Sequence, residues 1–422
     1  MNIKFKLKVI FFLQFFIWGS WLITLGSYMM ETLHFSGMTV GSVYGTMGIA
    51  SLFMPGLLGV VADRWIPANR LFMLCHLFGA ITLFIAASVT TPFMMIVIIL
   101  LHCLAFMPTI AISNSISYSC LESEGLEVIS QFPGIRIFGT IGFIVAMWLV
   151  SFLKVGLSNV QLYIAAGGSI LLSLYSLTLP LIVIAKDESK RKSLASSLGL
   201  DAFVLFKQPR IAIFFIFAVF LGGILQITNT FGNPFLLSFK NIPEYADSLV
   251  VQYPSVLLSI SQMSEVVFIL FVPFFMKRFG IKYVMLISML AWVARFGLFA
   301  FGDPSPVGFI LLLLSMIVYG CAFDFYNISG SMYVDKTVSP DIRNSAQGLF
   351  MIMTNGLGAY LGSTISGIVV DYYTVNDVID WRTIWLIFAG YSLVLAIIFV
   401  LIFQNDSLSD KAKKVNTSLE AS

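Results

Sequence analysis

Two carboxyl groups interrupt long apolar segments of this chain. Asp324 lies within SMIVYGCAFDFYNISGSMYVD (residues 315–335), and Glu265 lies in an apolar run that contains SISQMSEVV (residues 259–267). Both runs are long enough to cross a membrane as helices, and a charge at the centre of such a helix costs about 3 kcal/mol or more. The other acidic residues fall in loops, tails or helix ends. We therefore expect these two carboxyl groups to have a function.

Polar and aromatic residues recur on one face of each of four predicted helices. Spacings of three, four or seven residues place side chains on the same face of a helix. The residues at such spacings are Arg136, Thr140 and Phe143; Gln226, Asn229 and Asn233; Gln262 and Glu265; and Tyr319, Phe323 and Asn327, with Asp324 beside them.

These residue types suit one kind of solute. Amides and carboxylates can hydrogen-bond to neighbouring hydroxyl groups, such as those of a ribose, and aromatic rings can stack on a flat heterocycle. A carboxyl group removed from water is suited to binding and releasing a proton. The set predicts proton-coupled uptake of an uncharged polar solute. We favour Glu265 for proton coupling and Asp324 for hydroxyl recognition.

Each candidate also has a structural explanation. Amides in membrane helices often bond only to a neighbouring helix, for about 0.6 kcal/mol on average, and Asp324 would then serve helix assembly. Arg136 lies near the predicted inner end of its helix, where it could extend to the membrane surface. For Arg295, in AWVARFG, such snorkelling or a structural role is favoured over ligand binding. Gln14, Trp18 and Trp21, in the first apolar run, are further candidates to line a cavity, although the enrichment of Trp near membrane interfaces is the commoner explanation for the two tryptophans.

The whole chain has the composition of an all-α integral membrane protein. Of its 422 residues, 59% are hydrophobic and 11% are charged, which is more apolar than a soluble fold requires. Lipid offers no hydrogen bonds, so each span must pair its own backbone groups as a helix. The twelve predicted spans are residues 8–30, 40–62, 70–88, 93–117, 132–153, 161–184, 211–233, 255–275, 281–300, 307–330, 342–370 and 383–403.

Basic residues predict the orientation. Nineteen of the 24 Lys and Arg residues fall on one side of the predicted spans and three on the other. Positive residues concentrate on the cytoplasmic side, so both termini are expected there.

Several kinds of chemistry are not indicated. The four cysteines and three scattered histidines have no metal-ligand spacing, and the chain has no glycine-rich phosphate-binding motif. We therefore expect no metal, no cofactor other than the proton gradient, and no nucleic-acid partner. A paired nucleophile and base, which an enzyme would need, is also missing.

The chain divides at a charged linker. We expect residues 1–184 to form one six-helix half, 185–210 a cytoplasmic linker with an amphipathic segment (194–206), 211–403 a second half and 404–422 a tail. After the second span stands GVVADRWIPANR, and after the eighth stands FFMKRFGIKYV. Gly59, Asp63 and Arg64 in the first, and Lys277, Arg278 and Gly280 in the second, form matching loop motifs.

This arrangement resembles the major facilitator superfamily, whose loop signature is roughly G-x-x-x-D-R-x-G-R-K. Ile66 replaces the turn glycine of the first motif, whereas Gly280 supplies it in the second. The resemblance implies a substrate site near the membrane midplane between two halves, which rock to open it to each side in turn.

Longer stretches resemble the bacterial nucleoside:proton symporter family. They include FLQFFIWGSWLITLGSYM, FPGIRIFGTIGFIVAMW, LQITNTFGNPFL, SISQMSEVVFIL and LSMIVYGCAFDFYNISGS. The resemblance implies proton-driven nucleoside import, possible preference for xanthosine, a multi-pass protein of the bacterial inner membrane, and function as a monomer. It places substrate contacts on Arg136, Thr140, Phe143, Gln226, Asn229, Gln262, Glu265, Tyr319, Phe323 and Asp324. A proton-coupled sugar symporter or a drug exporter of the same fold is the alternative.

Overall fold

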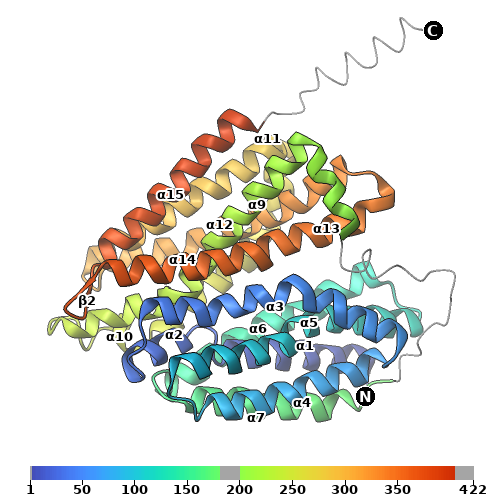
Figure 1. Cartoon of the computed structure of the whole chain (residues 1–422), viewed down its shortest axis with the longest axis horizontal. Coiled ribbons are helices and arrows are strands. Elements are labelled where there is room, and N and C mark those ends of the chain that lie inside the picture. Colours follow the sequence, from blue (N-terminus) through green and yellow to red (C-terminus); the bar gives the residue numbers. More distant parts are fainter. Residues whose placement is uncertain (1, 181–199, 404–422) are drawn as a thin grey trace, which may run out of the picture.

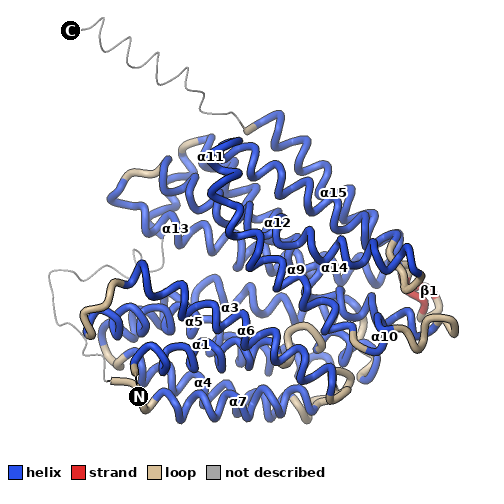
Figure 2. The backbone as a smooth tube through the Cα atoms, turned by 180° about the vertical axis from the view of Figure 1, so that it is seen from behind, coloured by secondary structure: helices blue, strands red, loops and turns tan. Residues whose placement is uncertain are grey.

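The computed structural model describes residues 2–180 and 200–403, and this part of the chain is almost entirely helical (Figures 1 and 2). Its strands, β1 (Thr374–Val375) and β2 (Val378–Ile379), form a short antiparallel hairpin. The expected tail, residues 404–422, and residues 185–199 of the expected linker lie outside the described residues. The described part of the expected amphipathic segment forms the 3-10 helix η3 (Leu200–Lys207).

The N-terminal elements form one bundle, which lies in the lower part of Figure 1. Its elements are α1 (Ile3–Gly19), α2 (Leu25–Ser27), the π-helical segment η1 (Tyr28–Thr32), α3 (Gly37–Arg64), α4 (Ala68–Ala86), α5 (Pro92–Ser123), α6 (Val128–Phe152) and α7 (Val160–Ser176). Helix α1 packs on α6 and α7, α3 packs on α5, and α4 packs on α5 and α7.

The C-terminal elements form the second bundle, in the upper part of Figure 1. After η3 come α9 (Pro209–Ser238), η4 (Phe239–Asn241), α10 (Leu249–Gln252), α11 (Pro254–Phe301), α12 (Pro306–Thr337), η5 (Pro340–Ile342), α13 (Arg343–Met351), the π-helical segment η6 (Ile352–Gly358), α14 (Ala359–Tyr372) and α15 (Trp381–Ile402). Helix α11 packs on α12 and α15, and α9 packs on α14 and η6.

The described residues hold twelve apolar helical segments of spanning character. Eight helices reach spanning length and hydropathy on their own: α3, α4, α5, α6, α9, α11, α12 and α15. Helix α11 contains two spans, because Gly280 (φ 77°, ψ 171°) breaks it at the predicted turn. Helices α1 and α7 are shorter, and the span expected over 342–370 is divided among α13, η6 and α14.

Helices α3 and α14 join the two bundles through glycines. Their backbones pass so closely that a Cβ atom on Gly41 would overlap the carbonyl oxygen of Ser363. Two helical turns further along α3, a Cβ atom on Gly48 would lie 2.5 Å from the carbonyl oxygen of Gly356, in the η6 segment that precedes α14. Small residues allow such close backbone approach, which favours dispersion contacts between membrane helices.

Charged groups join the bundles at the end that carries the hairpin. The Asp371 carboxylate, on α14, accepts hydrogen bonds from the backbone amides of Gly37 (2.5 Å) and Met38 (2.9 Å) at the N-terminus of α3. A carboxylate there satisfies otherwise unpaired N–H groups and interacts favourably with the helix dipole. Glu31 also forms an ion pair with Lys240 across the bundles. The predicted orientation makes this the outer end.

The opposite end of α3 is open. A Cβ atom on Gly59 would meet no other atom within 4 Å, and the Asp63 side chain is exposed. Lys277 and Arg278 are exposed as well, just before the break at Gly280. Both predicted loop motifs therefore lie on exposed turns at the end of the molecule away from the hairpin.

We predict that Gly41→Val weakens the outer closure. The added side chain overpacks the contact between α3 and α14, at a cost of about 1–3 kcal/mol. This cost shifts the equilibrium by about 5- to 150-fold toward the state in which the outer ends of the two helices are separated. A cysteine introduced at buried Leu237, beside the outer ends of both bundles, should then react faster with a membrane-impermeant maleimide. Gly390→Ala, where a Cβ atom meets nothing within 4 Å, is the control. Equal labelling in the two variants would contradict the prediction.

Candidate functional site

The polar faces of α6 and α11 meet between the two bundles. These helices contact each other, and the charges of Arg136 on α6 and Glu265 on α11 interact across the contact. Both side chains are half-buried. A cation and a carboxylate therefore face each other at the junction of the bundles, where a solute could contact both.

An aromatic wall stands beside Glu265. Tyr319 and Phe323, one turn apart on α12, stack with ring centroids 5.8 Å apart and planes only 5° apart. Tyr319 is buried and meets Trp292 edge to face, at 5.9 Å and 90°. The Gln262 side chain lies close to the Tyr319 hydroxyl. The wall thus presents a flat π surface close to an amide and a carboxyl group.

Asp324 lies deeper than Glu265. Its side chain is buried, with 4% of its surface exposed, and its charge interacts with that of Glu265. Its Oδ2 atom has no hydrogen-bond partner among the described residues. Burying an ionised carboxylate without donors or a cation is unfavourable. The position suits a carboxyl group that binds a proton.

The α6 residues pack against aromatic side chains of α1. The guanidinium carbon of Arg136 lies 4.6 Å from the ring centroid of Phe15. Phe143 is buried and meets Trp18 edge to face, at 6.3 Å and 90°. Thr140, between them on α6, is half-buried. Arg136 therefore faces the protein interior, where its charge remains available to Glu265.

The polar residues of α9 have two different surroundings, which their spacing in the sequence did not distinguish. Gln226 and Asn229 are half-buried, and Oε1 of Gln226 has no hydrogen-bond partner among the described residues. Asn233, expected on the same face, is buried, pairs with the Ser27 hydroxyl through Oδ1 (2.6 Å) and donates to the Ser255 hydroxyl (3.0 Å). Asn233 therefore joins the bundles near their outer ends, and its expected role in the polar face is wrong.

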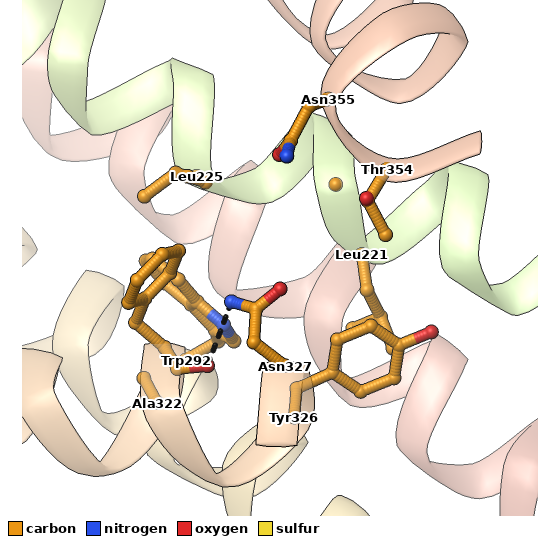
Figure 3. Close-up of a pocket in the computed structure, with 10 residues that line it drawn as sticks. Leu221, Leu225, Trp292, Ala322, Tyr326, Asn327, Thr354 and Asn355 are labelled. Carbon is orange, nitrogen blue, oxygen red and sulfur yellow. Dashed lines mark hydrogen bonds between the residues drawn. The ribbon is translucent and has the colours of Figure 1, made fainter. Parts of the chain in front are cut away.

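A small cavity of about 20 Å³ adjoins the aromatic wall (Figure 3). Asn327 on α12 and Asn355 on η6 point into it, as Figure 3 shows, and Phe323 and Trp292 form part of its lining. Asn327 donates to the carbonyl oxygen of Phe323 (3.0 Å), which leaves its own carbonyl oxygen toward the cavity. Sequence reasoning missed Asn355; its polar side chain within the predicted span 342–370 was the available signal.

Two further polar clusters differ from expectation. Arg295, for which snorkelling was one alternative, is buried with 2% of its surface exposed, so it does not reach the membrane surface. The scattered histidines His76 and His102 come together in the first bundle, both in ring contact with Phe106. Residues far apart in sequence meet there because α4 and α5 pack side by side.

Twelve spans in two bundles, with a cation and carboxyl groups between them, define a secondary transporter of the major facilitator type. A family model described as "Nucleoside H+ symporter" matches residues 1–407. The chain therefore belongs to the nucleoside H+ symporter family. It is a proton-coupled nucleoside symporter rather than an enzyme, with the proton as coupling ion. The expected family and transport class are confirmed.

Individual relatives agree with this assignment. The xanthosine permease of Escherichia coli (strain K12) is 63% identical over 413 residues, which cover 98% of this chain and 99% of that protein. The nucleoside permease NupG of the same organism is 57% identical over 404 residues, or 96% of each chain.

Solved structures confirm the expected fold. A crystal structure of the nucleoside transporter NupG matches with a TM-score of 0.92 and covers 96% of this chain and 100% of that chain. A bacterial homologue of the human lysosomal transporter Spinster, 16% identical, matches with a TM-score of 0.68 over 94% of this chain and 96% of that chain. The latter likeness concerns the fold alone.

We predict that Phe323→Ala weakens nucleoside binding. Stacking of a base on an aromatic ring contributes about 1–3 kcal/mol, so the Kd should rise about 5- to 150-fold. Calorimetric titration of the purified protein with a nucleoside measures the change. Phe301→Ala, at an exposed ring that contacts Arg382, is the matched control and should bind like the unmodified protein. An unchanged Kd for Phe323→Ala would remove this ring from the site.

Proposed function

We propose that the chain imports nucleosides together with protons through a site formed by α6, α9, α11 and α12. The observation that carries the proposal is the interaction of Arg136 and Glu265 across the two bundles, beside the stacked Tyr319–Phe323 pair. A solute bound there touches both bundles at once, so its binding couples their movement. The import direction follows from coupling to an inward proton gradient.

The proposed contacts divide by chemistry. The base stacks on Tyr319, Phe323 and, from the other bundle, Phe143. The ribose hydroxyls bond to the amide and carboxylate groups. The residues proposed for these polar contacts are Arg136, Thr140, Gln226, Asn229, Gln262 and Glu265. Partial exposure of all six supports the proposal, because a solute needs access to the groups that bind it.

The two carboxyl groups receive different roles. Glu265 interacts with the charge of Arg136, which favours the ionised carboxylate that accepts hydrogen bonds from ribose hydroxyls. Asp324 has no cation or hydrogen-bond donor at Oδ2 among the described residues. We therefore assign proton coupling to Asp324 and hydroxyl recognition to Glu265, which reverses the preference drawn from the sequence.

The conformation described here supports alternating access. Hydrogen bonds and an ion pair join the bundles at the hairpin end, whereas the far end of α3 is exposed. We infer an inward-open state, in which the outer contacts are closed and the loop motifs at Asp63 and Gly280 lie apart. Return to the outward-open state breaks the Asp371 and Glu31 contacts and brings the inner ends together.

Finer properties follow from the relatives. We propose xanthosine among the substrates, because a relative named xanthosine permease is 63% identical. Both named relatives come from Escherichia coli, which supports placement in a bacterial inner membrane with both termini in the cytoplasm. The complete site within one chain supports function as a monomer, divided into halves at residues 1–184 and 211–403 with the linker 185–210 between them.

Neutralising each carboxyl group separately tests their roles. Asp324→Asn should abolish nucleoside accumulation driven by a proton gradient but preserve nucleoside exchange across vesicles without a gradient, because recognition remains. Glu265→Gln should reduce both activities, since a ribose contact is lost, by about tenfold or more for a hydrogen bond to a charged group of about 1.5–3 kcal/mol. Asp201→Asn, at an exposed residue of η3, is the control. Normal accumulation by Asp324→Asn would refute the coupling role.

A competition assay tests the substrate class. Proton-dependent uptake of labelled uridine into vesicles should be inhibited by unlabelled xanthosine and abolished by a protonophore. Lactose should not compete, because it offers hydroxyl groups but no flat ring to stack on Phe323. Competition by lactose alone would favour the sugar symporter, and outward movement of the label would favour an exporter.

A further inference from the structure

Arg295 is a buried cation that the proposed contacts do not use. It lies in the second span of α11, after the break at Gly280, and 2% of its surface is exposed. Its Nη1 donates to the carbonyl oxygen of Ser315 (2.9 Å) and to the hydroxyl of Ser261 (3.3 Å). In return, the Ser315 hydroxyl donates to the carbonyl oxygen of Arg295 (2.9 Å).

No carboxylate of residues 2–180 or 200–403 forms an ion pair with Arg295. Its Nε atom has no hydrogen-bond partner among these residues either. Instead, its guanidinium carbon lies 4.6 Å from the Tyr319 ring centroid, 5.1 Å from that of Phe299 and 5.9 Å from that of Trp292. Removing a charge from water costs free energy, so a buried charge in a membrane helix indicates a function. The aromatic faces offset part of this cost by cation–π attraction.

The contacts of Arg295 hold both sides of the candidate site. Tyr319 lies between the guanidinium and Phe323, whose ring is parallel to it. Ser261 directly precedes Gln262 on α11, and the Gln262 side chain lies close to the Tyr319 hydroxyl. Ser315 lies one turn before Tyr319 on α12. One guanidinium therefore connects the helix that carries Gln262 and Glu265 with the helix that carries the aromatic wall.

We propose that Arg295 is a positioning residue for nucleoside recognition, which sets the plane of Tyr319 on which the base stacks and holds Gln262 toward it. The inference rests on the proposed function. Arg295 itself is covered by Tyr319, Phe299 and Trp292 and does not touch the solute. A planar guanidinium suits this role, because it can stack on a ring and donate to two oxygens at fixed angles.

A double-mutant cycle tests the inference in the full chain, reconstituted in vesicles, with uridine uptake as the measurement. Arg295→Gln should raise the KM about tenfold while Vmax at saturating uridine stays within about twofold, because the wall is misplaced rather than lost. In a Tyr319→Ala background the same substitution should leave the KM unchanged, since there is no ring to position. Arg295→Lys should recover only part of the loss, because a point charge cannot replace the planar fork.

Two variants separate positioning from general damage. Arg382→Gln removes a different cation–π contact of this bundle, between Arg382 and Phe301 (4.8 Å) at the hairpin end, and should leave the KM unchanged. Ser261→Ala removes only the 3.3 Å bond and should raise the KM about two- to fivefold even if Arg295→Gln does not insert, in line with a hydrogen bond worth about 0.5–1 kcal/mol.

The outcomes are distinct. The positioning role would be overturned if the KM effects of Arg295→Gln and Tyr319→Ala were additive. It would also be overturned if the KM were normal in both Arg295→Gln and Ser261→Ala. If Arg295→Gln does not insert, a normal KM in Ser261→Ala alone overturns it. Absence of uridine, xanthosine and other nucleoside uptake by the unmodified chain would instead overturn the proposed function.

Discussion

Every polar group placed inside a membrane must find its partner within the protein. This constraint orders the structure. Asn233 pairs with serines from both bundles, and Arg295 pairs with a carbonyl oxygen and aromatic rings. Several buried polar atoms, including Nε of Arg295 and Oδ2 of Asp324, nevertheless lack a hydrogen-bond partner among the described residues. The Asp324 carboxyl group can meet the constraint by binding a proton, which removes its charge.

The close contact between the two bundles depends on glycines, which have no side chain to keep the helices apart. Gly41 and Gly48 allow α3 to lie against the backbone of α14. Contacts between backbones have little freedom to rearrange locally. The bundles are therefore expected to move as rigid bodies, with the solute site between them.

Periodicity and charge predicted much of this molecule, but not the partners of its side chains. The twelve spans, and the choice of Asp324 and Glu265 as candidate site residues, follow from hydropathy, because lipid selects so strongly against buried charge. Spacing also grouped Asn233 with Gln226, although only the packing of α9 against the other bundle shows that Asn233 joins the halves. Arg295 could not be placed from sequence, since its ring contacts come from residues of two helices. The π-helical turn that directs Asn355 into the cavity has no signature in residue types.

The carboxylate of Asp371 binds peptide N–H groups of α3 rather than a side chain. The donors are therefore backbone groups that every residue except proline carries, so the chemistry of the contact places no demand on the side chain at position 38. Position 37 differs, because a Cβ atom there would lie 2.9 Å from the Asp371 carboxylate and from the carbonyl oxygen of Gly367. The first turn of α3 is thus constrained by space at position 37 and by the backbone N–H alone at position 38.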